Sequence, residues 1–536
     1  MAQILSPSAM HVRGTARPGH RIGFVLLVAA ILVAACGAPA ADGASGRTVR
    51  ILTGAAATID PAQAGDAGSA GVIAQVYETI TAFDSTLTLR PALAESWEIE
   101  DGGRRIVFRL RDDLAFSDGT PLTGADVVRS WLRLIDPQRP SPLVALALDV
   151  EGALAFVRGE TNDPTTVGLT ADGLEVTVEL VRPAADFITV VAGPSFAIVP
   201  PGIDDDPAVV RPGSFVASGG YTIAAEDLAT TTLAANPRYW AGGPATSEVV
   251  LVHDIGGQSP VAAYESGDID YAPIGDFDAS WIAYDPMLGP ELREVPSLSV
   301  QYYGFDTSRA PFDDVRVRQA FGAAVDWRRI VELGSAGSET VANSMVPPGI
   351  PGSSERDFVP VHDPDAARDM LADAGFPDGR GFPQVTMLTG GGQYDEAIVT
   401  EIERELGIEI TYETMSFDTY FTRLAAEPPQ IWSLSWVADY PGPNDFLGVL
   451  LGSGSSNNYG RWTSAEFDAA IADAGAATDE TAARAAYDRA EEIIRRDVPV
   501  VPVSYGTGWA LSRSNLLGAE QNGLGSIRMA GRAWAD

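Results

Sequence analysis

Few residues in this chain could act as nucleophiles or metal ligands. Cys36 is the single cysteine, and beyond it only His253 and His362 are histidines. A Cys–His nucleophile, a disulfide framework or a His/Cys zinc site needs such residues in larger numbers or closer together. Each of these histidines precedes an aspartate, which favours a surface turn. The sequence therefore predicts no catalytic residue, no metal site and no cofactor.

Cys36 follows an apolar segment of signal-peptide length. Arg13, Arg17 and Arg21 form a positive leader, and residues 23–35 form an apolar core that ends in small residues. This core falls short of the roughly 20 residues that span a bilayer. The run 33–36 (VAAC) resembles the lipobox of bacterial lipoproteins, in which the cysteine is acylated and becomes the mature N-terminus. The alternatives are an uncleaved transmembrane helix and a chance thiol.

Composition limits what the exported chain can bind. The sequence carries a net charge of −36. Because the leader has three arginines and no acid, the mature chain carries about −39. Such a surface repels nucleic acid and anionic lipid headgroups. The 501 residues after the leader are enough for two or three domains with ample cores.

Hydrophobic periodicity predicts the elements that position any site, in a mixed α/β arrangement. Strands are expected over 50–53, 105–110, 174–180, 249–253, 385–389, 408–414 and 498–503, and helices over 71–80, 125–134, 261–266, 394–406 and 481–496. A further helix begins at Asp313 or Asp314, and a capping box over 463–466 opens another. The segment 385–414 reads as a βαβ unit.

Six segments in a fixed order carry a family resemblance. They are PALAESWE at 91–98, FRLR continuing to FSDGTPLTGADV at 108–127, NPRYW at 236–240, YESGDID at 264–270, YYGFD with APFDDVRVR at 302–318, and WVADYP at 436–441 with Asn457-Asn458. Together they resemble the extracytoplasmic solute-binding proteins of family 5, which serve peptide and nickel ABC importers. The closest likeness is to the oligopeptide-binding branch.

The resemblance implies a three-domain, two-lobed clamp of the periplasmic-binding-protein type (type II, cluster C) with a hinge. It implies a monomeric lipoprotein outside the cytoplasmic membrane, on the periplasmic or cell-wall side, with an ABC permease and ATPase as partners. The expected division is a signal peptide over 1–35, a flexible tether over 36–47 from the lipidated Cys36, domain I over 48–80, 206–305 and 506–536, domain II over 81–205, and domain III over 306–505.

The resemblance also assigns a ligand site. In peptide-binding members the aspartate at position 439 forms a salt bridge with the ligand's α-ammonium, and the preceding residues lend backbone hydrogen bonds to a peptide that lies like an added strand. By itself, Asp439 before Tyr440-Pro441-Gly442-Pro443 would read as a turn former. The expected ligand-binding residues are Asp439, Trp436, Val437, Ser435, Ser433, Tyr302, Gly65 and Ala67.

The chain departs from the family at the other end of the ligand. Oligopeptide binders place basic side chains at or beside Ser433 and near Gln393 to receive the ligand's carboxylate, and neither position is basic here. The glycine run 390–392 lacks the lysine and spacing of a phosphate-binding loop, so we interpret it as a βα turn that lines the cleft. An amine-bearing ligand is supported, whereas a free carboxylate at a fixed distance is not.

Other functions stay open at this point. Nickel chelates, opines and oligosaccharides are alternative ligands, because fold does not fix ligand. A secreted hydrolase is a rival class, although the chain has no Gly-x-Ser-x-Gly elbow and no His-Glu-x-x-His motif. A surface receptor without a transport role would have the same sequence features.

Overall fold

The computed structural model describes residues 48–530 and 533–534, apart from 85, 336–338, 478, 519–521 and 525–526. The signal peptide, Cys36 and the tether expected over 36–47 lie outside the described residues. Residues 44–536 belong to one unit. Among the described helices, none is both long and apolar enough to cross a membrane.

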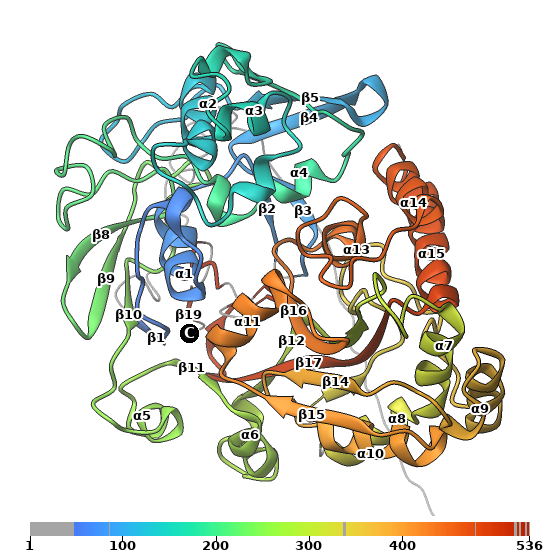
Figure 1. Ribbon diagram of the computed structural model, residues 1–536. Helices are drawn as coiled ribbons and strands as arrows, with labels where there is room; N and C mark the ends of the chain where they lie inside the picture. Colours follow the sequence, from blue (N-terminus) through green and yellow to red (C-terminus); the bar gives the residue numbers. More distant parts are fainter. Residues whose placement is uncertain are drawn as a thin grey trace, which may run out of the picture. The chain divides into compact units, whose positions relative to one another are not determined.

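One large mixed sheet is assembled from distant parts of the chain (Figure 1). Its strand order is β15-β14-β16-β12-β17-β11-β1-β10-β9-β8, and β13 also pairs with β17. The strands are β1 Val49–Leu52, β8 Tyr221–Glu226, β9 Thr230–Ala235, β10 Glu248–Val252, β11 Tyr271–Ile274, β12 Leu292–Phe305, β13 Glu339–Val341, β14 Val385–Thr389, β15 Ile410–Thr414, β16 Ile431–Val437 and β17 Val500–Ser512. The long antiparallel pair β12 and β17 joins the two halves of this sheet.

Helices follow most of these strands. They are α1 Ala67–Val76, α5 Pro260–Ser266, α6 Asp276–Ile282, α7 Val315–Ala324, α8 Trp327–Gly334, α9 Pro364–Asp373, α10 Asp395–Leu406, α11 Phe417–Ala426, α12 Pro443–Phe446, α13 Gly448–Leu451, α14 Ala465–Gly475 and α15 Glu480–Asp497. The predicted βαβ unit is confirmed, since β14 and β15 pair in parallel and α10 connects them. Asp314 caps α7 by accepting the N–H of Arg316 at 2.9 Å.

A separate antiparallel sheet with the order β4-β5-β7-β6 is built from 94–179. Its strands are β4 Ala94–Glu100, β5 Arg105–Leu110, β6 Leu169–Asp172 and β7 Glu175–Glu179, and its helices are α2 Gly124–Leu132, α3 Ala153–Val157 and α4 Phe187–Val190. Short pairs complete the strands, namely β2 Thr81–Phe83 with β3 Leu89–Pro91 and β18 Leu516–Leu517 with β19 Ala533–Trp534. Thr123 and Asp126 form the capping box that begins α2.

Several predicted boundaries were wrong, and three of them have a clear local cause. The helix expected over 71–80 is α1, which begins earlier because Asp66 caps it through the N–H of Ser69 at 2.8 Å. The N-cap of α14 is Ser464 and not Thr463, because the Ser464 hydroxyl accepts the N–H of Phe467. The strand expected from Val498 begins two residues later, because Val498 has a φ of 45° and ends α15.

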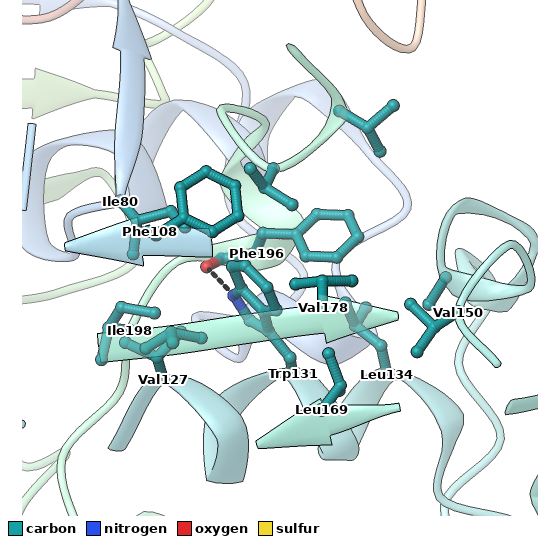
Figure 2. Packing of buried hydrophobic residues seen from close by; sticks show 14 of the residues in the cluster. Ile80, Phe108, Val127, Trp131, Leu134, Val150, Leu169, Val178, Phe196 and Ile198 are labelled. Atoms are coloured by element: carbon teal, nitrogen blue, oxygen red, sulfur yellow. Dashed lines mark hydrogen bonds between the residues drawn. The ribbon is translucent and has the colours of Figure 1, made fainter. Parts of the chain in front are cut away.

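Trp131 of α2 anchors the core beneath the separate sheet (Figure 2). Its ring is buried and meets Phe108, Phe187 and Phe196 edge to face, with ring centroids 5.5 to 6.3 Å apart. Its indole N–H donates to the carbonyl of Phe196 at 2.9 Å. The tryptophan therefore fills the centre of this core and satisfies a buried backbone carbonyl.

We predict that Trp131→Phe lowers the free energy of unfolding by about 1–3 kcal/mol, because the carbonyl of Phe196 loses its donor inside the core. Urea unfolding followed by circular dichroism measures the change. Trp281→Phe is the control, since Trp281 is 42% exposed and its replacement should change the free energy by no more than about 0.5 kcal/mol. Equal effects of the two substitutions would contradict the assignment.

Candidate functional site

The strand β16 has an open edge. It pairs with β12 from Ser299↔Val437 to Phe305↔Ile431, but with β14 only through Ile431 and Trp432. From Ser433 onward, β12 is the only described strand that pairs with β16. In an antiparallel pair, alternate residues direct their backbone groups to opposite sides. The Tyr420 hydroxyl of α11 accepts the Ser433 N–H at 3.2 Å and donates to the Ser433 carbonyl at 2.7 Å, so the Ser433 backbone faces away from β12. The backbone of Ser435 and Val437, which alternate with it, therefore faces the side that β14 has left.

The turn after β14 opens this edge. Gly390, Gly391 and Gly392 follow Thr389 directly, and Gly391 has a φ of 92°, where a side chain is strained. A Cβ on Gly392 would stand 2.9 Å from the Asp395 carboxylate. The glycines let the chain leave the sheet at this point, and the expected βα turn at 390–392 is observed.

A cavity of about 460 Å³ lies along the open edge. It is lined by Asp276, Gln301, Glu339, Gly390, Gly391, Gly392, Gln393, Tyr420, Ser433, Leu434 and Ser435. None of these described lining residues is basic, and two are acids. Glu339 accepts hydrogen bonds from the Gln393 amide at 2.9 Å and from the Tyr394 hydroxyl at 2.8 Å. The cavity therefore offers acceptors, amides and hydroxyls, but no cation for a carboxylate.

A further carboxylate lies under the glycine turn. Asp395 is buried and accepts hydrogen bonds from the Tyr303 hydroxyl at 2.5 Å, the Thr389 hydroxyl at 2.5 Å, the Gly392 N–H at 2.6 Å and the Tyr412 hydroxyl at 3.0 Å. Four donors satisfy both oxygens. Asp395 thus holds the turn in place and adds negative potential behind the cavity.

Asp439 follows the end of β16 and lies beside a second acid. The backbone N–H of Asp439 donates to Asp445 Oδ2 at 3.0 Å, and Trp436 Nε1 donates to the same oxygen at 3.1 Å. Asp439 is exposed, whereas Asp445 is completely buried. The surrounding protein removes water and raises the pKa of the Asp439 carboxyl above its ordinary value. Burial, and then the Asp439 charge, raise the pKa of Asp445 well above its ordinary value.

Tyr440 fixes the loop that carries Asp439. Its ring is 3% exposed and packs in the hydrophobic cluster of the separate four-stranded sheet. Its hydroxyl donates to Asp186 Oδ2 at 3.3 Å and accepts the Asn444 amide N–H at 3.0 Å. Burial raises the pKa of Asp186 as well. One side chain therefore ties the Asp439 loop to residues that precede α4.

The expected site residues other than Asp439 lie in three places: along β16, at the start of α1, and, for Tyr302, in the core. Ser433 and Ser435 line the cavity, Val437 is 57% exposed on the same strand, and the half-buried Trp436 bonds to Asp445. Gly65 and Ala67 are exposed in the loop before α1 and at its first turn.

Tyr302 lies in the core. Its ring is 1% exposed and meets Trp432 edge to face, so in this structure the side chain does not line the cavity. β12 alternates, and the neighbouring Gln301 reaches the cavity instead.

Sequence reasoning missed several residues of this site. Asp445, Gln301, Glu339 and Tyr420 come from four separate segments, and only Asp445 had a local signal, because it stands six residues after Asp439. Among the described residues, no group of three His, Cys, Asp or Glu side chains is arranged to hold a metal ion. Another cavity, of about 800 Å³, lies among α7, α9, α14 and α15 and shares no lining residue with this site.

Comparison with protein families decides the class of this chain. The model of bacterial extracellular solute-binding proteins, family 5 (middle), matches residues 88–458. The chain belongs to this family. The resemblance carried by the six sequence segments is therefore confirmed.

Curated relatives of this family 5 protein match along most of its length. The "Probable deoxycholate-binding periplasmic protein YgiS" of Escherichia coli (strain K12) is 30% identical over 475 residues, which cover 84% of this chain and 86% of the relative. The "Periplasmic oligopeptide-binding protein OppA" of Salmonella typhimurium is 28% identical over 499 residues, which cover 88% and 91%.

A solved structure supports the fold. The unliganded open form of the periplasmic murein tripeptide-binding protein MppA has a TM-score of 0.80 and 24% identity, covering 92% of this chain and 98% of that one. The expected mixed α/β fold of the periplasmic-binding-protein type is confirmed. As a member of family 5, the chain is a non-enzymatic, extracytoplasmic solute-binding protein that serves an ABC importer for peptides or related solutes.

We predict that Tyr440→Phe lowers the free energy of unfolding by about 1–3 kcal/mol, because Asp186 and the Asn444 amide lose a buried partner. It should also increase amide hydrogen exchange over 438–446. Urea unfolding and exchange mass spectrometry measure the two effects. Tyr284→Phe serves as the control, since Tyr284 is 89% exposed. An exchange rate in the Tyr440→Phe variant equal to that of the wild type would show that Tyr440 does not anchor the loop.

Proposed function

We propose that this protein captures peptides by their free α-ammonium group and delivers them to an ABC permease and ATPase complex. The observation that carries the proposal is Asp439 at the end of the open edge of β16. A peptide placed along Ser435 to Val437 would extend the sheet as an added strand, because the Tyr420 hydroxyl already occupies the backbone of Ser433. Its N-terminus would then reach Asp439.

The dimensions suit a short peptide. Ser433 and Asp439 are six residues apart, which is at most about 20 Å of extended chain. The cavity beside Ser433 and Ser435 would receive the other end of the ligand. A peptide of about three to six extended residues fits this span. Because no basic side chain among the described residues lines this cavity, we infer that the protein does not bind the terminal carboxylate of the peptide at a fixed distance.

A bile acid fits the charges of this site poorly. Deoxycholate has a carboxylate and no amine, and the site presents Asp439 and Asp445 at one end and Asp276 and Glu339 at the other. Like charges at close range disfavour binding by several kcal/mol. Native mass spectrometry of protein purified without denaturation would identify the bound solute. Recovery of a solute without an amine would contradict the proposal.

We also propose the three-domain division with its hinge, over the boundaries given in the sequence analysis. Two observations support it: the separate four-stranded sheet lies wholly within 81–205, and the long strands β12 and β17 connect the two halves of the large sheet. The proposal includes acylation of Cys36 as the membrane anchor.

We predict that Asp439→Asn weakens peptide binding about 30-fold to several-thousand-fold, because loss of one partner of a desolvated charge pair costs about 2–5 kcal/mol. N-acetylation of the peptide should cost as much. The two changes together should cost less than their sum, and C-terminal amidation should matter little. Calorimetry with the four combinations of protein and peptide measures these effects.

The matched control is Asp112→Asn, which removes an exposed acid in the turn after β5. It should bind as the wild type does. Equal affinity of the wild type and Asp439→Asn for the free-amine peptide would refute capture through Asp439.

We predict that Cys36→Ala abolishes lipid attachment and leaves a soluble or uncleaved protein that lacks lipid. A single acyl chain binds membranes only marginally, so stable retention of the wild type requires more than one. Fractionation and intact-mass measurement check this. A membrane-bound Cys36→Ala protein with a diacylglyceryl mass would contradict the assignment.

A further inference from the structure

Asp445 is a buried carboxylate without a cationic partner. Its residue is 0% exposed, and its Oδ2 accepts two N–H groups, from Trp436 and from the Asp439 backbone. Its Oδ1 has no hydrogen-bond partner in the structure. No ion pair involves Asp445 among the described residues. Two neutral donors on one oxygen leave half of an ionised carboxylate unsatisfied.

The groups around Asp445 make its ionisation harder. Asp439 lies beside it on the same loop, and Asp186 acts on it from the segment before α4. Tyr440, which bonds to Asp186, and Tyr487 of α15 complete the titratable surroundings. Arg182 lowers the pKa of Asp186, and its guanidinium forms an ion pair with Asp149. Three acids thus stand together, and the one nearby arginine has a partner of its own.

Two ionised carboxylates this close, one of them without water, are strongly unfavourable. A proton on the buried member removes the repulsion. The proton also neutralises the Oδ1 atom, which has no donor. A buried neutral hydroxyl without a partner is less unfavourable than a buried negative oxygen without one. The two donors on Oδ2 favour ionisation only partly. Burial outweighs these two donors and favours the protonated form of Asp445.

We propose that Asp445 is a positioning residue of the amine site, and that the Asp439–Asp445 pair holds one proton which the ligand's ammonium displaces to solvent. This inference rests on the proposed capture of an amine by Asp439. The charges balance: the pair carries −1 in the empty site, the ligand brings +1, and the pair reaches −2 as the proton passes to the buffer. Asp445 also fixes the Asp439 backbone and the Trp436 ring through its Oδ2.

The sign of the pH dependence follows from this exchange. A cation favours the ionised pair, so ligand binding lowers the pKa of the pair and releases a proton. Affinity therefore rises with pH by up to about tenfold per pH unit between the pKa values of the bound and empty pair. It becomes constant above that window, while the ligand amine keeps its own proton.

The test uses alanyl-alanyl-alanine amide as the probe and calorimetry in buffers of different ionisation heat from pH 5.5 to 7.5. We expect the wild type to release close to one proton per ligand at the acid end. Asp445→Asn keeps the shape and an acceptor oxygen for Trp436 and Asp439. It should release none and lose the pH dependence.

Glu491→Gln is the matched control. Glu491 of α15 is also completely buried, and burial raises its pKa to about 7, but its carboxylate receives the Met345 N–H and it does not act on Asp445. This variant should release the proton as the wild type does. Proton release by Asp445→Asn equal to that of the wild type, or none by the wild type, would overturn the proposal.

Infrared difference spectroscopy of the ligand-free protein separates this inference from the proposed function. Glu491 gives one protonated-carboxyl band in the wild type, because its pKa is raised to about 7, and Glu491→Gln should lack that band. The band of Asp445 should appear in the wild type and in Glu491→Gln, and Asp445→Asn should lack it. If Asp445→Asn does not fold, Asp439→Asn should shift this band to lower pH. Failure of the probe to bind counts against amine capture, whereas absence of the band counts against the proton on Asp445.

Discussion

The site depends on the point at which β14 stops. A strand inside a sheet has both edges paired, and a peptide could not join it. Here β14 ends at Thr389, the glycines turn away, and β16 continues alone beside β12. The buried Asp395 beneath the turn holds this geometry with four hydrogen bonds. The open edge, the cavity beside it and the path to Asp439 all follow from that early end.

The acids of the site lack the arginine partners that many acids elsewhere in the described structure have. Most of the described arginines form ion pairs with acids, many of them on the exterior, as Arg489 does with Asp473. The acids of the site have no such partners among the described residues. Asp395 is satisfied by neutral donors, and Asp445 is satisfied on one oxygen only. A cation brought by the ligand would complete this arrangement, because unpaired buried acids favour a positive partner.

Family membership narrows the function without fixing the ligand. Relatives matched along most of this chain are named for deoxycholate, murein peptides, heme and oligopeptides. A shared fold can serve all of these ligands, because the fold supplies the framework and a few side chains supply specificity. In the proposed site the neutral Ser433 and Gln393 lie at one end and the paired acids at the other.

The sequence by itself determined the class of the protein and most of its elements. Local patterns specified the βαβ unit at 385–414, a helix cap at Asp313 or Asp314 and the turn at 390–392, because caps, turns and periodicity act over a few residues. Ordered motifs specified the family and pointed to Asp439.

Tertiary structure decided what depends on contacts between distant segments. It put Tyr302 in the core and Gln301 in the cavity, placed Glu339 beside Gln393, and buried Asp445 next to Asp439. The register of β12 against β16 sets the places of Tyr302 and Gln301, and no local pattern encodes a register between strands more than a hundred residues apart.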